Sequence, residues 1–141
     1  MSPAAAVIVA VSFVWLGMVL AISFLEAPLK FRAPGVTLQI GLGIGRLVFR
    51  ALNSVEILFA VAILIALAAD PPATSVNVAI AVAVVALAVQ LLAVRPRLTR
   101  RSDAVLSGSD APRSHAHYAY VALEAVKVIA LSTGGILLLS A

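Results

Sequence analysis

Four long apolar stretches dominate the sequence and leave few folds open to it. They cover residues 4–25, 47–69, 76–94 and 115–139. An α-helix rises about 1.5 Å per residue, so about 20 residues span the roughly 30 Å hydrocarbon core of a bilayer. The 141 residues include only ten Lys or Arg and six Asp or Glu, whereas about a quarter of the residues in a soluble domain are charged. The sequence therefore predicts an all-α integral membrane protein with four spans.

The segments between the stretches predict two turns and one longer loop. Residues 26–35 contain two prolines and a glycine, which oppose a straight helix, and Asp70-Pro71-Pro72 ends the second span. Residues 95–114 are polar and predict a loop before the fourth span. Short connections favour antiparallel neighbours, so we expect an up-down-up-down four-helix bundle that forms a single domain over residues 1–141.

The basic residues gather in two of these connections. Nine of the ten lie there, namely Lys30, Arg32, Arg46, Arg50, Arg95, Arg97, Arg100, Arg101 and Arg113. By the positive-inside rule both connections face the cytoplasm and both termini lie outside, as expected of a multi-pass protein of the cytoplasmic (inner) membrane. Orientation in the lipid bilayer, with anionic lipid as a further contact of the arginines, accounts for the net charge of +4. Nucleic acid is therefore not an expected partner.

Polar side chains inside the spans fall on narrow helical stripes. They recur at spacings of three and four, which place them on one face of a helix: Arg50, Asn53 and Glu56 in the second span, His117, Tyr120, Glu124 and Lys127 in the fourth, with Gln90 in the third and Glu26 at the end of the first. In the predicted orientation all lie in the cytoplasmic half, and Lys127 is nearest the midplane. A charge in hydrocarbon costs about 2.5 to 3.5 kcal/mol on insertion scales, so we expect these faces to converge.

A structural interpretation of these nine residues needs no ligand. In it, either Glu56 or Glu124 pairs with Lys127, and Arg50 pairs with the other carboxylate. The amides of the second and third spans then form hydrogen bonds between helices. An apolar pair would stabilise a bundle as well or better, so this interpretation leaves the choice of charged residues unexplained.

A functional interpretation is that the protein binds or conducts a small solute or ion at this intramembrane site. Glu56 and Glu124 are then titratable or ion-binding carboxylates and Lys127 is their counter-ion. The side chains that orient the solute by hydrogen bonds are Asn53, Gln90, His117 and Tyr120. All nine are candidate binding residues. Four spans are few for a transporter, so a homodimer is compatible with this function.

Two further functions stay open. A metal- or haem-dependent redox enzyme would use His117, Glu56 and Glu124, with Glu26 as a further ligand, because carboxylates and an imidazole suit iron and similar ions. The spacing Glu-x-x-His that such sites often use is absent from the sequence. Alternatively, the chain is an accessory subunit whose apolar outer face binds a larger membrane complex. The sequence does not decide whether the protein is an enzyme, and it firmly implies no cofactor.

Residues 15–50 also carry a resemblance to a known family. Trp15-Leu16-Gly17 is followed by Phe24-Leu25-Glu26-Ala27-Pro28-Leu29-Lys30-Phe31, and Gly45-Arg46-Leu47-Val48-Phe49 opens the second span. This segment resembles small four-span proteins of the copper-resistance-D-like superfamily, in particular its uncharacterised TMEM-type branch. The resemblance implies a four-helix membrane bundle, with relatives linked to copper handling and, in one branch, to oxidation of protoporphyrinogen.

The sequence departs from the chemistry of those relatives. It has two methionines, Met1 and Met18, no cysteine, and no histidine in the first span. Soft ligands for Cu(I) are therefore scarce, and an axial histidine for haem could come only from the fourth span.

Overall fold

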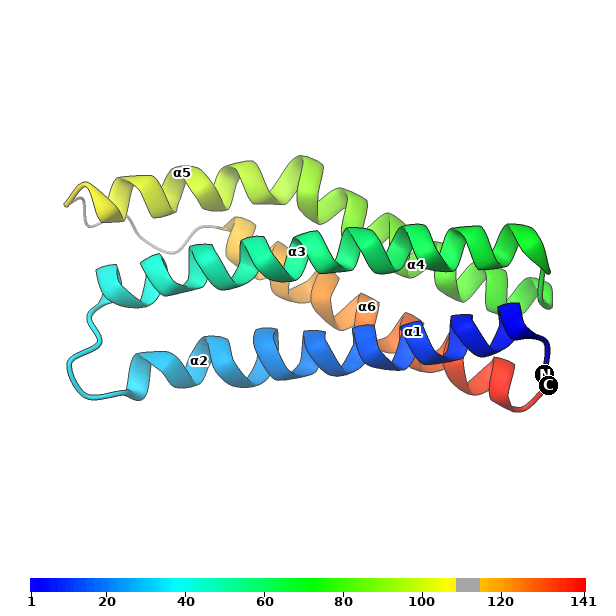
Figure 1. The fold of residues 1–141 in the computed structure, drawn as a ribbon. Helices are drawn as coiled ribbons and strands as arrows, with labels where there is room; N and C mark the ends of the chain where they lie inside the picture. Colours follow the sequence, from blue (N-terminus) through cyan, green and yellow to red (C-terminus); the bar gives the residue numbers. More distant parts are fainter. Residues whose placement is uncertain (109–114) are drawn as a thin grey trace.

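The computed structural model describes residues 1–108 and 115–141. Within these ranges the chain forms four long helical rods that run side by side (Figure 1): Pro3–Arg32, Leu38–Ala69, Thr74–Leu106 and His115–Leu139. Each rod is long and apolar enough to cross a membrane. The predicted all-α four-helix bundle is thus confirmed, and by helix length and hydropathy the chain is a multi-pass membrane protein.

Successive rods run in opposite directions, so the two chain termini lie together at one end of the bundle (Figure 1). We call this the terminal end. The opposite end holds the connection between the first two rods and the tip of the third, with Lys30, Arg46 and Arg101 among its residues, and we call it the basic end. This arrangement confirms the up-down topology. The position of the termini outside the cell remains a prediction of the positive-inside rule.

The first rod continues past a proline without breaking. It consists of α1 (Pro3–Val19), the π-helical segment η1 (Leu20–Glu26), α2 (Ala27–Leu29) and the 3₁₀ turn η2 (Lys30–Arg32). Pro28 lacks an N–H and its ring presses on the preceding turn. The wider π-helical turn ends at this point, where the N–H of Ala27 donates to the carbonyl of Ile22, and so accommodates the ring. The break predicted for residues 26–35 is therefore confined to the turn after Arg32, where Gly35 has a φ of +79°.

The third rod also has a π-helical segment just before a proline, Pro96. It consists of α4 (Thr74–Val89), the π-helical segment η3 (Gln90–Val94) and α5 (Arg95–Leu106), and the N–H of Arg95 donates to the carbonyl of Gln90. Pro96 lies in the first turn of α5, where its missing N–H costs no hydrogen bond of the helix. The prediction of a loop from residue 95 is therefore wrong for residues 95–106. The rest of that predicted loop, including Arg113, extends into residues outside the described ranges.

The second rod, α3 (Leu38–Ala69), begins well before the predicted start at Leu47. The hydroxyl of Thr37 caps the helix by accepting a hydrogen bond from the N–H of Ile40 at 3.2 Å, so the glycine-rich segment that follows is helical. The earlier start adds more than two helical turns at the basic end. Arg46 lies in these added turns, beyond the apolar part of the span.

Close packing of the fourth rod, α6 (His115–Leu139), depends on two adjacent glycines. α6 packs along α4 and α1, and α1 also packs along α3. A Cβ atom added to Gly134 would lie 3.1 Å from Ile80 of α4, and one added to Gly135 would lie 2.8 Å from the ring of Phe13 of α1. The two glycines therefore let α6 approach both neighbours at the terminal end, as small residues do in membrane bundles.

We predict that Gly135→Ala destabilises the bundle by about 1 to 3 kcal/mol, because the new methyl group overlaps Phe13. Gly17→Ala is the matched control, since a Cβ there meets nothing within 4 Å. Alanine is the better helix former, so the control is expected to be neutral or slightly stabilising. Unfolding in mixed micelles, followed by the fluorescence of the only tryptophan, Trp15, measures both. Equal effects of the two substitutions would contradict this account of the packing.

Candidate functional site

Two carboxylates and one ammonium meet in the interior of the bundle. Lys127 of α6 donates to Glu56 of α3 and also forms an ion pair with Glu124, which lies one turn earlier in α6. At most 1% of each of these three side chains is exposed. With both carboxylates ionised, the group carries a formal charge of −1. The convergence of the stripes in the second and fourth spans is therefore observed.

The other two rods add hydrogen bonds to these carboxylates. From the first rod, the indole N–H of Trp15 donates to Glu56 at 2.7 Å, and the hydroxyl of Ser23 donates to Glu124. From the third rod, the side-chain amide of Gln90 donates to Glu124 at 2.7 Å and to the backbone carbonyl of Tyr120 at 3.3 Å. All four rods thus contribute to one polar network, whose side chains are Trp15, Ser23, Glu56, Gln90, Glu124 and Lys127. We call this set the buried network.

A second polar contact lies one turn nearer the basic end. The hydroxyl of Tyr120 donates to the side-chain oxygen of Asn53 at 3.3 Å, which joins α6 to α3. The ring of Phe49 packs edge-on against Tyr120, and Phe49 also receives the guanidinium of Arg95 at 5.7 Å from its centroid. The interhelical hydrogen bonds predicted for Asn53 and Gln90 are thus present.

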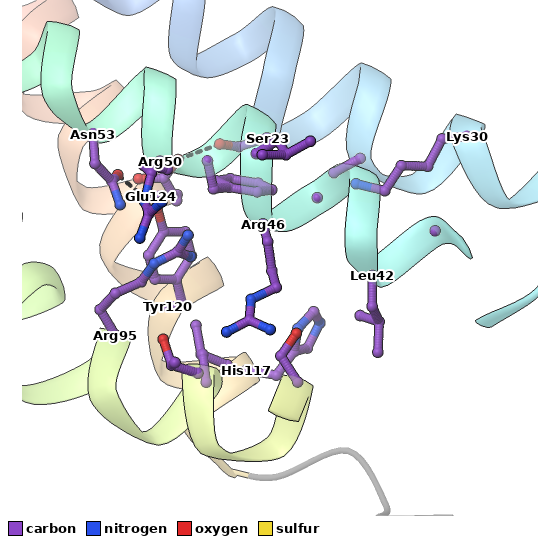
Figure 2. A pocket seen from close by; sticks show the side chains of 18 of the residues that line it. Ser23, Lys30, Leu42, Arg46, Arg50, Asn53, Arg95, His117, Tyr120 and Glu124 are labelled. Atoms are coloured by element: carbon purple, nitrogen blue, oxygen red, sulfur yellow. Dashed lines mark hydrogen bonds between the residues drawn. The ribbon is translucent and has the colours of Figure 1, made fainter. Parts of the chain in front are cut away.

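A pocket of about 910 Å³ extends from the basic end down to Glu124. Figure 2 shows its polar wall, where arginines from α3 and α5 lie opposite Tyr120 and Asn53. Five of its lining residues are basic: Lys30, Arg46, Arg50, Arg95 and Arg101. Ser23 and Glu124 line it as well, so the buried network forms part of the pocket wall. We call this cavity the basic pocket.

The nine predicted site residues fall into three groups. Glu56, Gln90 and Lys127 belong to the buried network, Glu124 belongs to both sites, and Arg50, Asn53, His117 and Tyr120 line the basic pocket. Glu26 joins neither group, because its carboxylate lies 3.9 Å from Lys30 of the next turn and is 36% exposed.

The structural interpretation of the charges needs one correction. Both carboxylates pair with Lys127, whereas Arg50 forms an ion pair with neither of them among the described residues. The physical reason is depth. Arg50 lies almost two turns closer to the basic end than Glu56, so it reaches the open pocket and not the interior.

Four residues of the two sites were not predicted as site residues from the sequence. Trp15 was not predicted as a site residue, and it is fully buried with its N–H donating to Glu56. Ser23 shares the helical stripe of Glu26 but was not predicted as a site residue. Lys30 and Arg95 were assigned to orientation in the bilayer and to contact with anionic lipid, and both line the pocket. A proline at the first turn of a helix was the signal that could have placed Arg95 on α5.

The described residues do not form a metal site. No group of three or more His, Asp or Glu in these ranges converges on a point where they could hold a metal ion. His117, Glu56 and Glu124, which a metal-dependent enzyme would use, are thus not brought together as a ligand set.

Comparisons with protein-family models, with curated proteins and with solved structures found no match to this chain. The resemblance to the copper-resistance-D-like superfamily therefore remains a prediction from residues 15–50.

We predict that Lys127→Met costs about 3 to 5 kcal/mol of stability, because it leaves two carboxylates buried without a counter-charge. The triple variant that adds Glu56→Gln and Glu124→Gln removes the charges together and is expected to recover most of that loss. Unfolding in mixed micelles measures both proteins. A triple variant as unstable as the single one would show that packing of the Lys127 stem, and not charge, sets the cost.

Proposed function

We propose that this protein binds a small charged solute within the membrane, in the basic pocket, with Glu124 at the base of the site. One observation carries this proposal: the pocket opens at the basic end and ends on the buried network. A solute that enters the pocket therefore reaches a carboxylate that accepts hydrogen bonds from two other rods and pairs with Lys127 of its own rod. Intramembrane ionisable residues commonly mark such sites.

Stability alone does not account for the pocket. A bundle of this kind could be held together by apolar side chains at equal or lower cost. The lining residues also leave an excess of positive charge, since five basic residues face one wall carboxylate, Glu124. Like charges gathered around a cavity repel one another, and this repulsion is relieved when a solute of opposite charge enters.

The other end of the site is closed. Toward the terminal end, Leu131 lies one turn beyond Lys127 and belongs to an apolar cluster with Ile63 and Ile80, all fully buried. An open channel would need water or polar groups at this level. The geometry therefore supports binding from the basic end, with movement across the membrane only if the buried network rearranges. By the positive-inside rule the basic end faces the cytoplasm.

A single introduced cysteine tests this proposal, because the natural chain contains none. In Ser23→Cys the thiol lies at the base of the basic pocket, so we expect it to react in purified protein with the charged thiol reagent methanethiosulfonate ethylsulfonate. Ser132→Cys is the matched control. Ser132 is also half-buried within a span, but it lies outside the pocket, and we expect it to react much more slowly.

Protection from this reaction then reports binding. We expect at least one of four probes to slow the labelling of Ser23→Cys: sodium chloride, potassium phosphate, sodium acetate and dodecyl phosphate. The same probe should leave Ser132→Cys unaffected. If the thiol at residue 23 is inert, or if none of the four probes protects it, the proposed binding site is wrong.

A further inference from the structure

Two arginines of the basic pocket lack a carboxylate partner among the described residues. Arg46 pairs with Asp103 at 2.6 Å and Lys30 lies 3.9 Å from Glu26, whereas in these ranges no Asp or Glu lies within ion-pair distance of Arg50 or Arg95.

These two arginines come from different rods and point into the same space. Figure 2 shows the side chains of Arg50 from α3 and Arg95 from α5 converging beside Tyr120. Arg46 lines the same pocket, and the like charges of the three arginines repel one another there. Two guanidinium groups held this way offer several N–H donors to one anion, and their planar, forked geometry matches phosphate oxygens well.

The depth of the two arginines matches the position of a lipid headgroup. At about 1.5 Å per residue, Arg50 lies roughly 28 Å along α3 from Ala69, and Arg95 lies roughly 32 Å along the third rod from Thr74. A hydrocarbon core of about 30 Å that begins at the Ala69–Thr74 turn therefore ends near these two residues. An anion bound between them lies at the boundary between hydrocarbon and headgroups.

Apolar residues of the pocket wall face the lipid. Phe24, Leu47 and Ile57 all line the pocket, and their side chains are 42%, 70% and 47% exposed on the surface of the bundle. Because the same side chains belong both to the pocket wall and to the outer surface of the rods, the pocket opens sideways into the bilayer. An alkyl chain attached to the bound anion can therefore lie against these residues while its head stays between the arginines.

We infer that the basic pocket binds an anionic amphiphile, a molecule with a phosphate head and an alkyl chain. This inference rests on the proposed function and names its ligand class. The phosphate lies between Arg50 and Arg95, with the hydroxyl of Tyr120 beside it, and the chain leaves the pocket past Ile57, toward the hydrocarbon core. The head enters at the basic end, as in the proposed function, and the chain lies on the lipid-facing side of the pocket wall.

The test compares three probes that separate head from chain. Dodecyl phosphate carries both, inorganic phosphate carries only the head, and dodecyltrimethylammonium carries the same chain with a positive head. Each is titrated into purified protein in dodecyl maltoside, and binding is read from the rise in unfolding temperature, which follows ligand concentration over Kd. We expect dodecyl phosphate to bind at least about tenfold more tightly than inorganic phosphate, and the cation not to bind.

Two double variants show whether the arginines recognise the head. Arg50→Gln with Arg95→Gln is expected to weaken binding of dodecyl phosphate about tenfold to a hundredfold, as loss of hydrogen bonds to a charged group does. Arg97→Gln with Arg100→Gln removes the same charge from exposed positions of α5 that do not line the pocket. This control is expected to bind within about twofold of the natural protein, because screened surface charges contribute little.

Failure of this inference differs from failure of the proposed function. Equal affinity for inorganic and dodecyl phosphate would overturn the amphiphile, and so would an equal loss of affinity in both double variants. In either case protection of Ser23→Cys by one of its probes would still support a solute site. If neither phosphate binds and no probe protects that thiol, both proposals are wrong.

Discussion

The ammonium of Lys127 constrains the whole bundle, because two buried carboxylates depend on it. Glu56 can reach it only if α3 and α6 are in one axial register and both turn their polar stripes inward. Trp15 and Gln90 then fix the first and third rods, since each donates to one of these carboxylates. In hydrocarbon a lost hydrogen bond cannot be replaced by water. A shift of any rod by one turn would therefore break at least one of these buried contacts, and this selects one arrangement among the many that apolar surfaces alone would allow.

Two prolines lie at the level of the basic pocket, one in the first rod and one in the third. Pro28 and Pro96 each follow a π-helical segment, η1 and η3, and both segments end just before their proline. The wider turn of a π-helical segment accommodates the proline ring, so each rod continues past its proline. Pro28 and Arg95 both line the basic pocket. The same two segments also carry Ser23 and Gln90, whose side chains donate hydrogen bonds to Glu124 at the base of the pocket.

Much of this structure could be predicted from the sequence, but the helix over residues 95–106 and the role of Trp15 could not. Apolar length fixed the four rods, and spacings of three and four placed Glu56, Glu124 and Lys127 on facing stripes. The helical course of residues 95–106 was missed because a proline and four arginines in a polar segment predict a loop as readily as a helix extended into the headgroups. The role of Trp15 was missed for a different reason. Its N–H is one polar group within an apolar run, and its partner, 41 positions away, is set by tertiary packing alone.

Charge balance links the basic pocket to the buried network through Glu124. The network carries one negative charge in excess when both carboxylates are ionised, and the pocket next to it carries several positive charges. Each partly compensates the other, because electrostatic interactions act over longer distances where water is scarce. An anion bound between Arg50 and Arg95 neutralises part of the positive charge that otherwise acts on Glu124. Occupancy of the pocket therefore weakens the compensation that the basic residues give to Glu124 and leaves Lys127 as its nearest counter-charge. In this way a ligand at the headgroup level acts on the contact that holds all four rods together.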